Sequence, residues 1–218
     1  MNDSHFIYML PMGNINGRFL ETLRLNIEYQ LDLPCRLMEP INLPEYAYDS
    51  ERWQYNSLEI LKLILNLSPK DAIKILGLCN IDLYIPIQNF IFGQAQFNGL
   101  AAIVSMRRLN GEYHGEACGE ALIFRRTLKE VMHELGHAFG LIHCHSPRCV
   151  MSQSINVEQV DQKEIDFCDE CQTFIGQHIM RWKLCWAEFY RQERSWWWTT
   201  RRSFANLSRA GSRKMALK

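Results

Sequence analysis

Apolar residues in the N-terminal part of the chain follow the spacings of both strands and helices. The apolar run from Phe6 to Leu10 precedes Pro11 and Gly13 and predicts a first strand. Apolar positions then recur with helical spacing and predict an amphipathic helix through Phe19, Leu23, Ile27 and Leu31. We expect a short strand over residues 36–38 and a second helix over residues 58–67.

The middle of the chain carries signals of further elements. Ser68-Pro69 predicts the start of a helix, because proline is tolerated in the first turn, and Gly77 predicts its end. Residues 81–85 alternate between apolar and polar, and residues 101–105 are apolar, so both segments are expected to be strands. These elements predict an α/β (α+β) protein with a mixed, twisted sheet backed by helices.

A helix with unusual chemistry is expected after a loop over residues 111–119. Thr127 and Glu130 have the spacing of a capping box, which predicts that the helix begins there. The stretch that follows contains His133, Glu134 and His137. On a helix, His133 and His137 lie one turn apart on one face, so both imidazoles can reach one metal ion.

A third ligand is predicted just beyond this helix. Gly140 can adopt a left-handed conformation, end the helix and turn the chain back, which brings His143 to the same ion. Three protein ligands leave one position open for water, as in a catalytic zinc site. Glu134 is then placed to act as general base on that water without being a ligand itself. The alternative is a buried helix with incidental histidines.

Four cysteines follow in two short pairs, Cys144 with Cys149 and Cys168 with Cys171. Two such pairs separated by a loop match the ligand pattern of a closed, structural zinc site. The alternatives are two disulfides, a redox-active pair at Cys168 and Cys171, or unrelated free thiols. We therefore predict two Zn²⁺ ions per chain, one catalytic and one structural.

Charge is distributed unevenly, although the net charge is zero. Residues 181–218 hold 10 of the 24 Lys and Arg residues but only 2 of the 24 Asp and Glu residues, together with Trp182, Trp186 and Trp196–Trp198. Such a tail can bind single-stranded nucleic acid or an anionic membrane surface. We favour an accessory extension, helical over residues 179–192 and disordered from about residue 199, and expect no nucleic-acid partner for the domain itself.

Neither a secretory signal nor a membrane span is apparent in the sequence. We therefore expect a cytoplasmic protein, in which thiols stay reduced and free for zinc. We expect three parts: residues 1–140 with the zinc-binding helix, residues 141–180 as a small subdomain stabilised by its metal, and the tail over residues 181–218. A monomer is expected.

The run from His133 to Cys171 resembles the archaemetzincin family, which joins the extended histidine motif to Cys, Cys, Met and a terminal Cys-x-x-Cys. Blocks upstream resemble it too: Arg52-Trp53-Gln54-Tyr55, Asp82-Leu83-Tyr84, Asn89 to Ala95, Ile103-Val104-Ser105 and Arg108-Leu109. The resemblance covers roughly residues 6–178. It implies a metzincin-like zincin fold, the two ligand sets given above, and Met151 in a methionine turn beneath the catalytic zinc.

The resemblance also implies a function. It indicates a zinc metallopeptidase that hydrolyses peptide bonds, with restricted or aminopeptidase-like specificity, on a peptide or protein substrate. In metzincins the substrate lies along an edge strand, which we expect at residues 99–105; a buried strand without substrate contact is the alternative. A zinc-stabilised binding protein with little or no cleavage is the alternative function. The intact Glu134 favours the peptidase.

Overall fold

The computed structural model describes residues 5–111, 118–181 and 183. The chain divides into two compact units, Met1–Ile175 and Gly176–Lys218. The labelled helices and strands all belong to the first unit. A further helix covers residues 169–181. Apart from Arg181 and Lys183, the basic, Trp-rich tail lies outside the described residues, including Trp182, Trp186 and Trp196–Trp198, so the expectations for it stay predictions.

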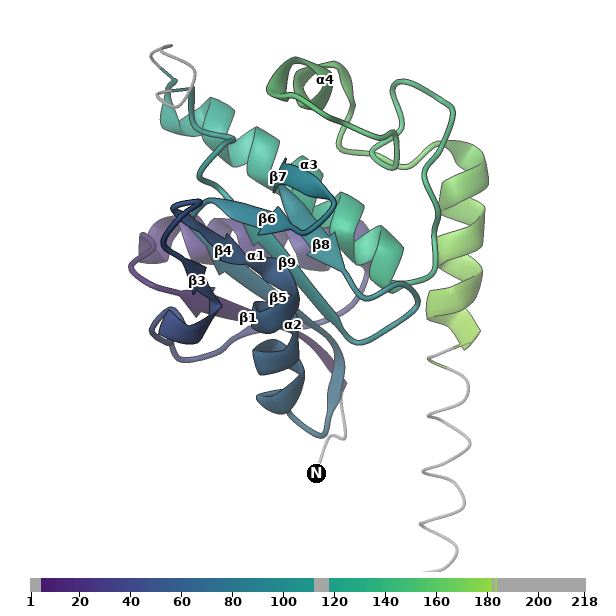
Figure 1. Ribbon diagram of the computed structural model, residues 1–218. Helices are drawn as coiled ribbons and strands as arrows, with labels where there is room; N and C mark the ends of the chain where they lie inside the picture. Colours follow the sequence, from purple (N-terminus) through teal and green to yellow (C-terminus); the bar gives the residue numbers. More distant parts are fainter. Residues whose placement is uncertain (1–4, 112–117, 182, 184–218) are drawn as a thin grey trace, which may run out of the picture. The chain divides into compact units, whose positions relative to one another are not determined.

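A five-stranded sheet forms the centre of the first unit (Figure 1). Its order is β2-β1-β5-β9-β8, with β1 at Phe6–Met12, β2 at Cys35–Leu37, β5 at Ala72–Cys79, β8 at Gly93–Ala95 and β9 at Ala101–Ser105. The first four of these strands run parallel, and β8 pairs antiparallel with β9. Strand β8 therefore ends the sheet on one side.

Helices cover both faces of this sheet. Helix α2 (Ser57–Asn66) packs on one face, where Ile60 and Ile64 join alternate residues of β1 such as Tyr8 and Leu10 in the core. Helices α1 (Gly17–Leu31) and α3 (Glu120–Ala138) contact each other and lie on the opposite side of the sheet from α2 (Figure 1). Because both faces are covered, β1 and β5 are buried along their whole length.

A smaller four-stranded sheet has the order β3-β4-β6-β7. Its strands are β3 at Tyr48–Asp49, β4 at Gln54–Asn56, β6 at Leu83–Ile85 and β7 at Gln88–Ile91, and a 3₁₀ turn, η1, covers Glu45–Ala47. Helix α4 (Val157–Gln162) follows α3 along the chain and contacts it. The predicted mixed α/β architecture is thus confirmed, as are the first strand, the first two helices and the strand over residues 101–105.

The prediction of a helix from Pro69 to Gly77 is wrong, because this segment leads into β5. A strand that is buried on both faces shows no alternation, so its sequence does not distinguish it from a buried helix. Gly77 lies inside the strand, where a Cβ would come within 2.6 Å of Ile64 Cδ1. The glycine permits close packing of α2 on the sheet.

The predicted capping box is also wrong. Helix α3 begins at Glu120, and Thr127 and Glu130 lie in its interior. The Thr127 hydroxyl donates to the Ile123 carbonyl one turn back, and Glu130 forms an ion pair with Lys163. Thr127 and Glu130 therefore have the spacing of a capping box without forming one, because each interacts with a different residue.

The expected edge strand is the third error. Strand β9 lies between β5 and β8, so residues 99–105 do not form the edge of the sheet. The alternative of a buried strand describes β9, since all five of its residues are buried. The edge is β8, which comes earlier in the chain. No helix of the described residues is long and apolar enough to cross a membrane.

Candidate metal centre

The three predicted histidines converge at the C-terminal end of α3. His133 and His137 project from its last turns, and the helix ends at Ala138. Gly140 has a φ of +96°, and its N–H donates to the His137 carbonyl at 2.9 Å. This reversal returns His143, so that ring nitrogens of all three residues lie within 4.8 Å of one another. The expected role of Gly140 is thereby confirmed in geometry.

Hydrogen bonds orient two of the rings. His133 Nδ1 lies 2.8 Å from the Val150 carbonyl, and His137 Nδ1 lies 2.7 Å from the Leu141 carbonyl. Because a carbonyl only accepts, each Nδ1 carries the proton, and each Nε2 presents a lone pair. Backbone carbonyls of this kind are common partners of metal-bound histidines.

The two Nε2 atoms of His133 and His137 are 3.1 Å apart. Two lone pairs that face each other at this distance repel unless a cation or a proton lies between them. Ligating nitrogens of a tetrahedral zinc site with Zn–N bonds of 2.0–2.1 Å are about 3.3 Å apart. The spacing and tautomers of these residues therefore fit a zinc ion.

The protonation of the histidines also suits a metal. Burial lowers the pKa of His133 well below its usual value, and it lowers the pKa values of His137 and His143 as well. The positive charge of Lys163 lowers all three pKa values further. The rings are therefore neutral at physiological pH, which is the form that binds metal.

Glu134 is buried beside this cluster. Its carboxylate makes no hydrogen bond or ion pair with any residue in the described part of the chain. Burial raises its pKa well above the usual value, and the nearby charge of Glu130 raises it further. Its side chain lies against β8, where a Cβ on Gly93 would come within 2.7 Å of Glu134 Cγ. An unpaired carboxylate in this position is open to a water molecule or a substrate.

Met151 lies against the helix between the first two histidines. A Cβ on Gly136 would come within 2.4 Å of the Met151 sulfur. The neighbouring Val150 carbonyl bonds His133, and the Met151 carbonyl accepts the Cys144 N–H at 2.9 Å. The loop that contains Val150 and Met151, called the methionine loop below, thus contacts both α3 and the segment that carries Cys144.

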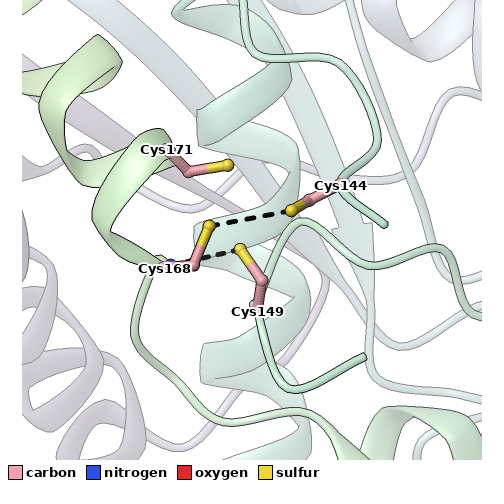
Figure 2. A group of neighbouring side chains, drawn as sticks. All are labelled: Cys144, Cys149, Cys168 and Cys171. Atoms are coloured by element: carbon pink, nitrogen blue, oxygen red, sulfur yellow. Dashed lines mark hydrogen bonds between the residues drawn. The ribbon is translucent and has the colours of Figure 1, made fainter. Parts of the chain in front are cut away.

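The four predicted cysteines form a second cluster, with their sulfur atoms pointing toward one another (Figure 2). All four are free thiols whose Sγ atoms lie within 4.8 Å of one another. The sulfurs of Cys144 and Cys168 are 3.7 Å apart, far beyond a disulfide bond but close to the roughly 3.8 Å expected around a tetrahedral zinc. The geometry favours a metal site over disulfides.

Backbone N–H groups also point at these sulfurs. The Cys168 N–H donates to Cys149 Sγ, and the Ser146 N–H donates to Cys144 Sγ. Burial raises the pKa values of Cys149 and Cys171, while the backbone N–H of Cys171 lowers that of Cys168. Metals bind the thiolate form of cysteine. Binding of a cation would therefore be coupled to the loss of protons from these four thiols.

A cleft of about 560 Å³ opens over the histidine cluster. Its floor contains His133, Glu134, His137 and His143. One side is formed by residues of β7 and β8, and another by the segment 153–155 that follows Met151. Glu130 and Glu134 are among the residues that line it, and no Lys or Arg side chain is among the described ones.

Residues that follow Met151 are held to α3 by polar contacts of the buried Arg126 and Lys129 side chains, which the sequence did not predict. Arg126 forms a two-pronged ion pair with Asp161 at 2.6 and 2.8 Å. Lys129 Nζ donates to the carbonyls of Val160 and Asp161, both at 3.0 Å. These contacts bind the last turn of α4 to α3.

Lys163 completes this arrangement. Its ammonium group lies 2.9 Å from Glu130 Oε1 and 3.2 Å from the Ser152 carbonyl, with 1% of the lysine side chain and 4% of the glutamate side chain exposed. One buried cation therefore joins α3 to the residue after Met151. Nothing in the spacing of Glu130 and Lys163 along the sequence signals this pair.

Comparison with known proteins agrees with the geometry. The sequence profile of peptidase family M54 matches residues 14–177. The chain is 36% identical over 165 residues to the archaemetzincin of Methanocaldococcus jannaschii, an alignment covering 76% of this chain and 89% of that protein.

Two crystal structures are also similar. The archaemetzincin of Methanopyrus kandleri matches with a TM-score of 0.72 and 30% identity, over 82% of this chain and 97% of that one. The archaemetzincin of Archaeoglobus fulgidus matches with a TM-score of 0.67 and 33% identity, over 78% and 99%. Fold and sequence are therefore shared over most of the chain's length.

Proposed function

Since the chain belongs to peptidase family M54, the archaemetzincins, and is accordingly a zinc metallopeptidase, we propose which residues perform the hydrolysis and how. The catalytic zinc is held by His133, His137 and His143, and Glu134 is the general base. The single observation that carries this assignment is the pair of Nε2 lone pairs 3.1 Å apart beside an unpaired, buried Glu134. A bound zinc ion supplies Lewis acidity at this point.

Glu134 performs the proton transfers. Its carboxylate accepts a proton from the attacking water while the water oxygen forms a bond to the peptide carbonyl carbon. The C–N bond then breaks, and the same carboxyl group delivers the proton to the departing amine. Contact of the Glu134 side chain with Gly93 limits where this carboxylate can lie, which supports its role as a positioned base.

The substrate is a peptide segment bound in extended form beside β8. Support comes from two observations: β8 ends the five-stranded sheet, and its three residues line the cleft that holds the histidines. Pairing of backbone groups gives affinity with little demand on sequence. The shortness of β8, Gly93–Ala95, limits this pairing to a few residues and is consistent with the restricted specificity that we propose.

A second zinc ion is bound by Cys144, Cys149, Cys168 and Cys171 and has a structural role. Their mutual distances and their N–H···S hydrogen bonds support this assignment. Free thiols in the described chain are consistent with a reducing, cytoplasmic location, which we propose on that ground. The boundaries at residues 140 and 180 and the monomeric state stay predictions.

Metal analysis and turnover together test this proposal. Purified protein should contain two zinc ions per chain, His143→Ala should retain only one, and Cys171→Ser should lose the other along with stability. Glu134→Gln should keep both ions and the fold but lose turnover of peptides. One zinc ion per chain, or undiminished turnover in Glu134→Gln, would contradict the assignment.

A further inference from the structure

The hydroxyl of Ser154 has an unusual environment. Ser154 Oγ is buried and has no hydrogen-bond partner, and it is the sole such side-chain N or O atom among the described residues. A buried hydroxyl without a partner is unfavourable, because it has given up its bonds to water. Native proteins keep few such groups, and each calls for an explanation.

Ser154 belongs to the catalytic cleft. It lies three residues after Met151, and it lines the same cleft as Glu134 and the histidines. The residue as a whole is partly exposed, although its hydroxyl is turned inward. Rotation about χ1 moves a serine hydroxyl between staggered positions at small energetic cost, so the group can turn toward a bound molecule.

The backbone on both sides of Ser154 is fixed. The Ser152 carbonyl accepts from the buried ammonium group of Lys163. The Ile155 N–H donates to Gln159 Oε1 at 2.8 Å, and Asn156 caps α4 by accepting from the Gln159 N–H. The backbone that carries the donor therefore needs little reorganisation when substrate binds, and only the hydroxyl has to turn.

We propose that Ser154 is a further catalytic residue, whose hydroxyl donates a hydrogen bond to the carbonyl oxygen of the peptide bond under attack. The proposal rests on the peptidase function and cleft described above. Negative charge develops on this oxygen during hydrolysis, so a donor there stabilises the transition state more than the bound substrate. On this proposal, the Ser154 hydroxyl lacks a hydrogen-bond partner in the free protein because its partner is the substrate.

The test separates catalysis from folding. Ser154→Ala removes an unsatisfied group, so its melting temperature should equal or exceed that of the wild type. Its kcat on peptides should nevertheless fall at least about tenfold, with KM changed less than about threefold. Ser154→Thr keeps a hydroxyl and should recover kcat to within about threefold of the wild type. Ser152→Ala, in the same loop, is the matched control and should leave kcat unchanged.

Three outcomes would overturn the assignment. Unchanged kcat in Ser154→Ala means that the hydroxyl takes no part in the reaction. A rise in KM alone means that it contributes equally to binding of the substrate and of the transition state, and so does not accelerate the chemical step. A lower melting temperature with loss of zinc means that its role is structural, for instance through a buried water. Glu134→Gln, assayed beside these variants, distinguishes failure of the Ser154 proposal from failure of the peptidase mechanism. If Glu134→Gln retains full turnover, the proposed peptidase mechanism fails as well.

Discussion

The sulfur of Met151 lies against the backbone of Gly136, at the point on α3 between His133 and His137. A Cβ at Gly136 would come within 2.4 Å of that sulfur. Glycine is unfavourable inside a helix by roughly 1 kcal/mol relative to alanine. Its presence in the buried part of α3 is therefore explained by the close approach of the methionine loop and not by helix formation.

Gly136→Ala should consequently destabilise the protein even though alanine favours helices. The methyl group would displace Met151 and, through the bond from His133 to the Val150 carbonyl, the first histidine. Overpacking of this kind costs roughly 1–3 kcal/mol of unfolding free energy. Urea unfolding and zinc affinity, measured beside Gly17→Ala, check this. A methyl group at Gly17, the first residue of α1, would meet no atom within 4 Å, so that variant should be at least as stable as the wild type. Equal stability of both variants would contradict the close contact.

Gly93→Ala should impair turnover without removing zinc. The new methyl group would lie 2.7 Å from Glu134 Cγ, 2.8 Å from the Ile103 carbonyl oxygen and 3.0 Å from Glu134 Oε1, so both the carboxylate and the backbone of β8 must shift. A small misplacement of a catalytic group commonly lowers activity by about 100-fold. The measurement is kcat/KM together with zinc content. Normal turnover with both zinc ions bound would show that the position of Glu134 beside β8 is unimportant.

Lys163→Met should be strongly destabilising, because it leaves the buried Glu130 carboxylate without its partner. Removing one member of a buried ion pair typically costs about 3–5 kcal/mol, whereas replacing both by apolar residues is often neutral. The double variant Glu130→Leu/Lys163→Met should therefore recover most of the lost stability in urea unfolding. Lys62→Met, which removes an exposed pair with Glu59, should change stability by less than about 1 kcal/mol. A double variant as unstable as Lys163→Met would rule out this explanation.

Stability at alkaline pH should depend on Lys74. Burial lowers the pKa of Lys74 to about 8 from its usual 10.5, although its ammonium group donates to the Gly99 carbonyl at 2.7 Å. Between these two values the unfolded chain binds more protons than the native protein, so this residue makes the native state more stable as pH rises. The contribution is at most about 1.4 kcal/mol per pH unit across this window.

Urea unfolding of wild type and Lys74→Met at pH 7.5 and 9.5 measures this contribution. The difference in stability between wild type and Lys74→Met should shift in favour of the wild type at the higher pH. Lys62→Met, an exposed lysine, should show no such shift. A parallel response of wild type and Lys74→Met to pH would mean that Lys74 is charged throughout the range.

The candidate metal-binding residues of the site are more predictable from sequence than the tertiary contacts that hold them in place. The spacing of His133, His137 and His143, and of the four cysteines, determines which side chains can meet, because a helix and a glycine turn leave few alternatives. The close grouping of both sets in the structure agrees with that spacing. The zinc content of the His143→Ala and Cys171→Ser variants tests their roles as zinc ligands.

The errors arise where tertiary context overrides a local signal. Strand β5 carries proline before it and glycine within it, yet burial on both faces decides its conformation. Thr127 and Glu130 match a capping box by spacing, but Glu130 is paired with a lysine 33 residues away. The unsatisfied hydroxyl of Ser154 is likewise invisible in sequence, because it depends on what surrounds the loop in three dimensions.

The role of Glu134 in peptide hydrolysis is tested by digestion of an unbiased peptide mixture, with the newly formed amino termini identified by mass spectrometry. Zinc-loaded wild type should produce new termini, whereas Glu134→Gln with the same zinc content should produce almost none. The termini would also reveal which residues the cleft accepts on either side of the cleaved bond. Identical sets of new termini from the two proteins would contradict the role of Glu134 as general base, and the absence of new termini from both would favour a zinc-stabilised binding protein.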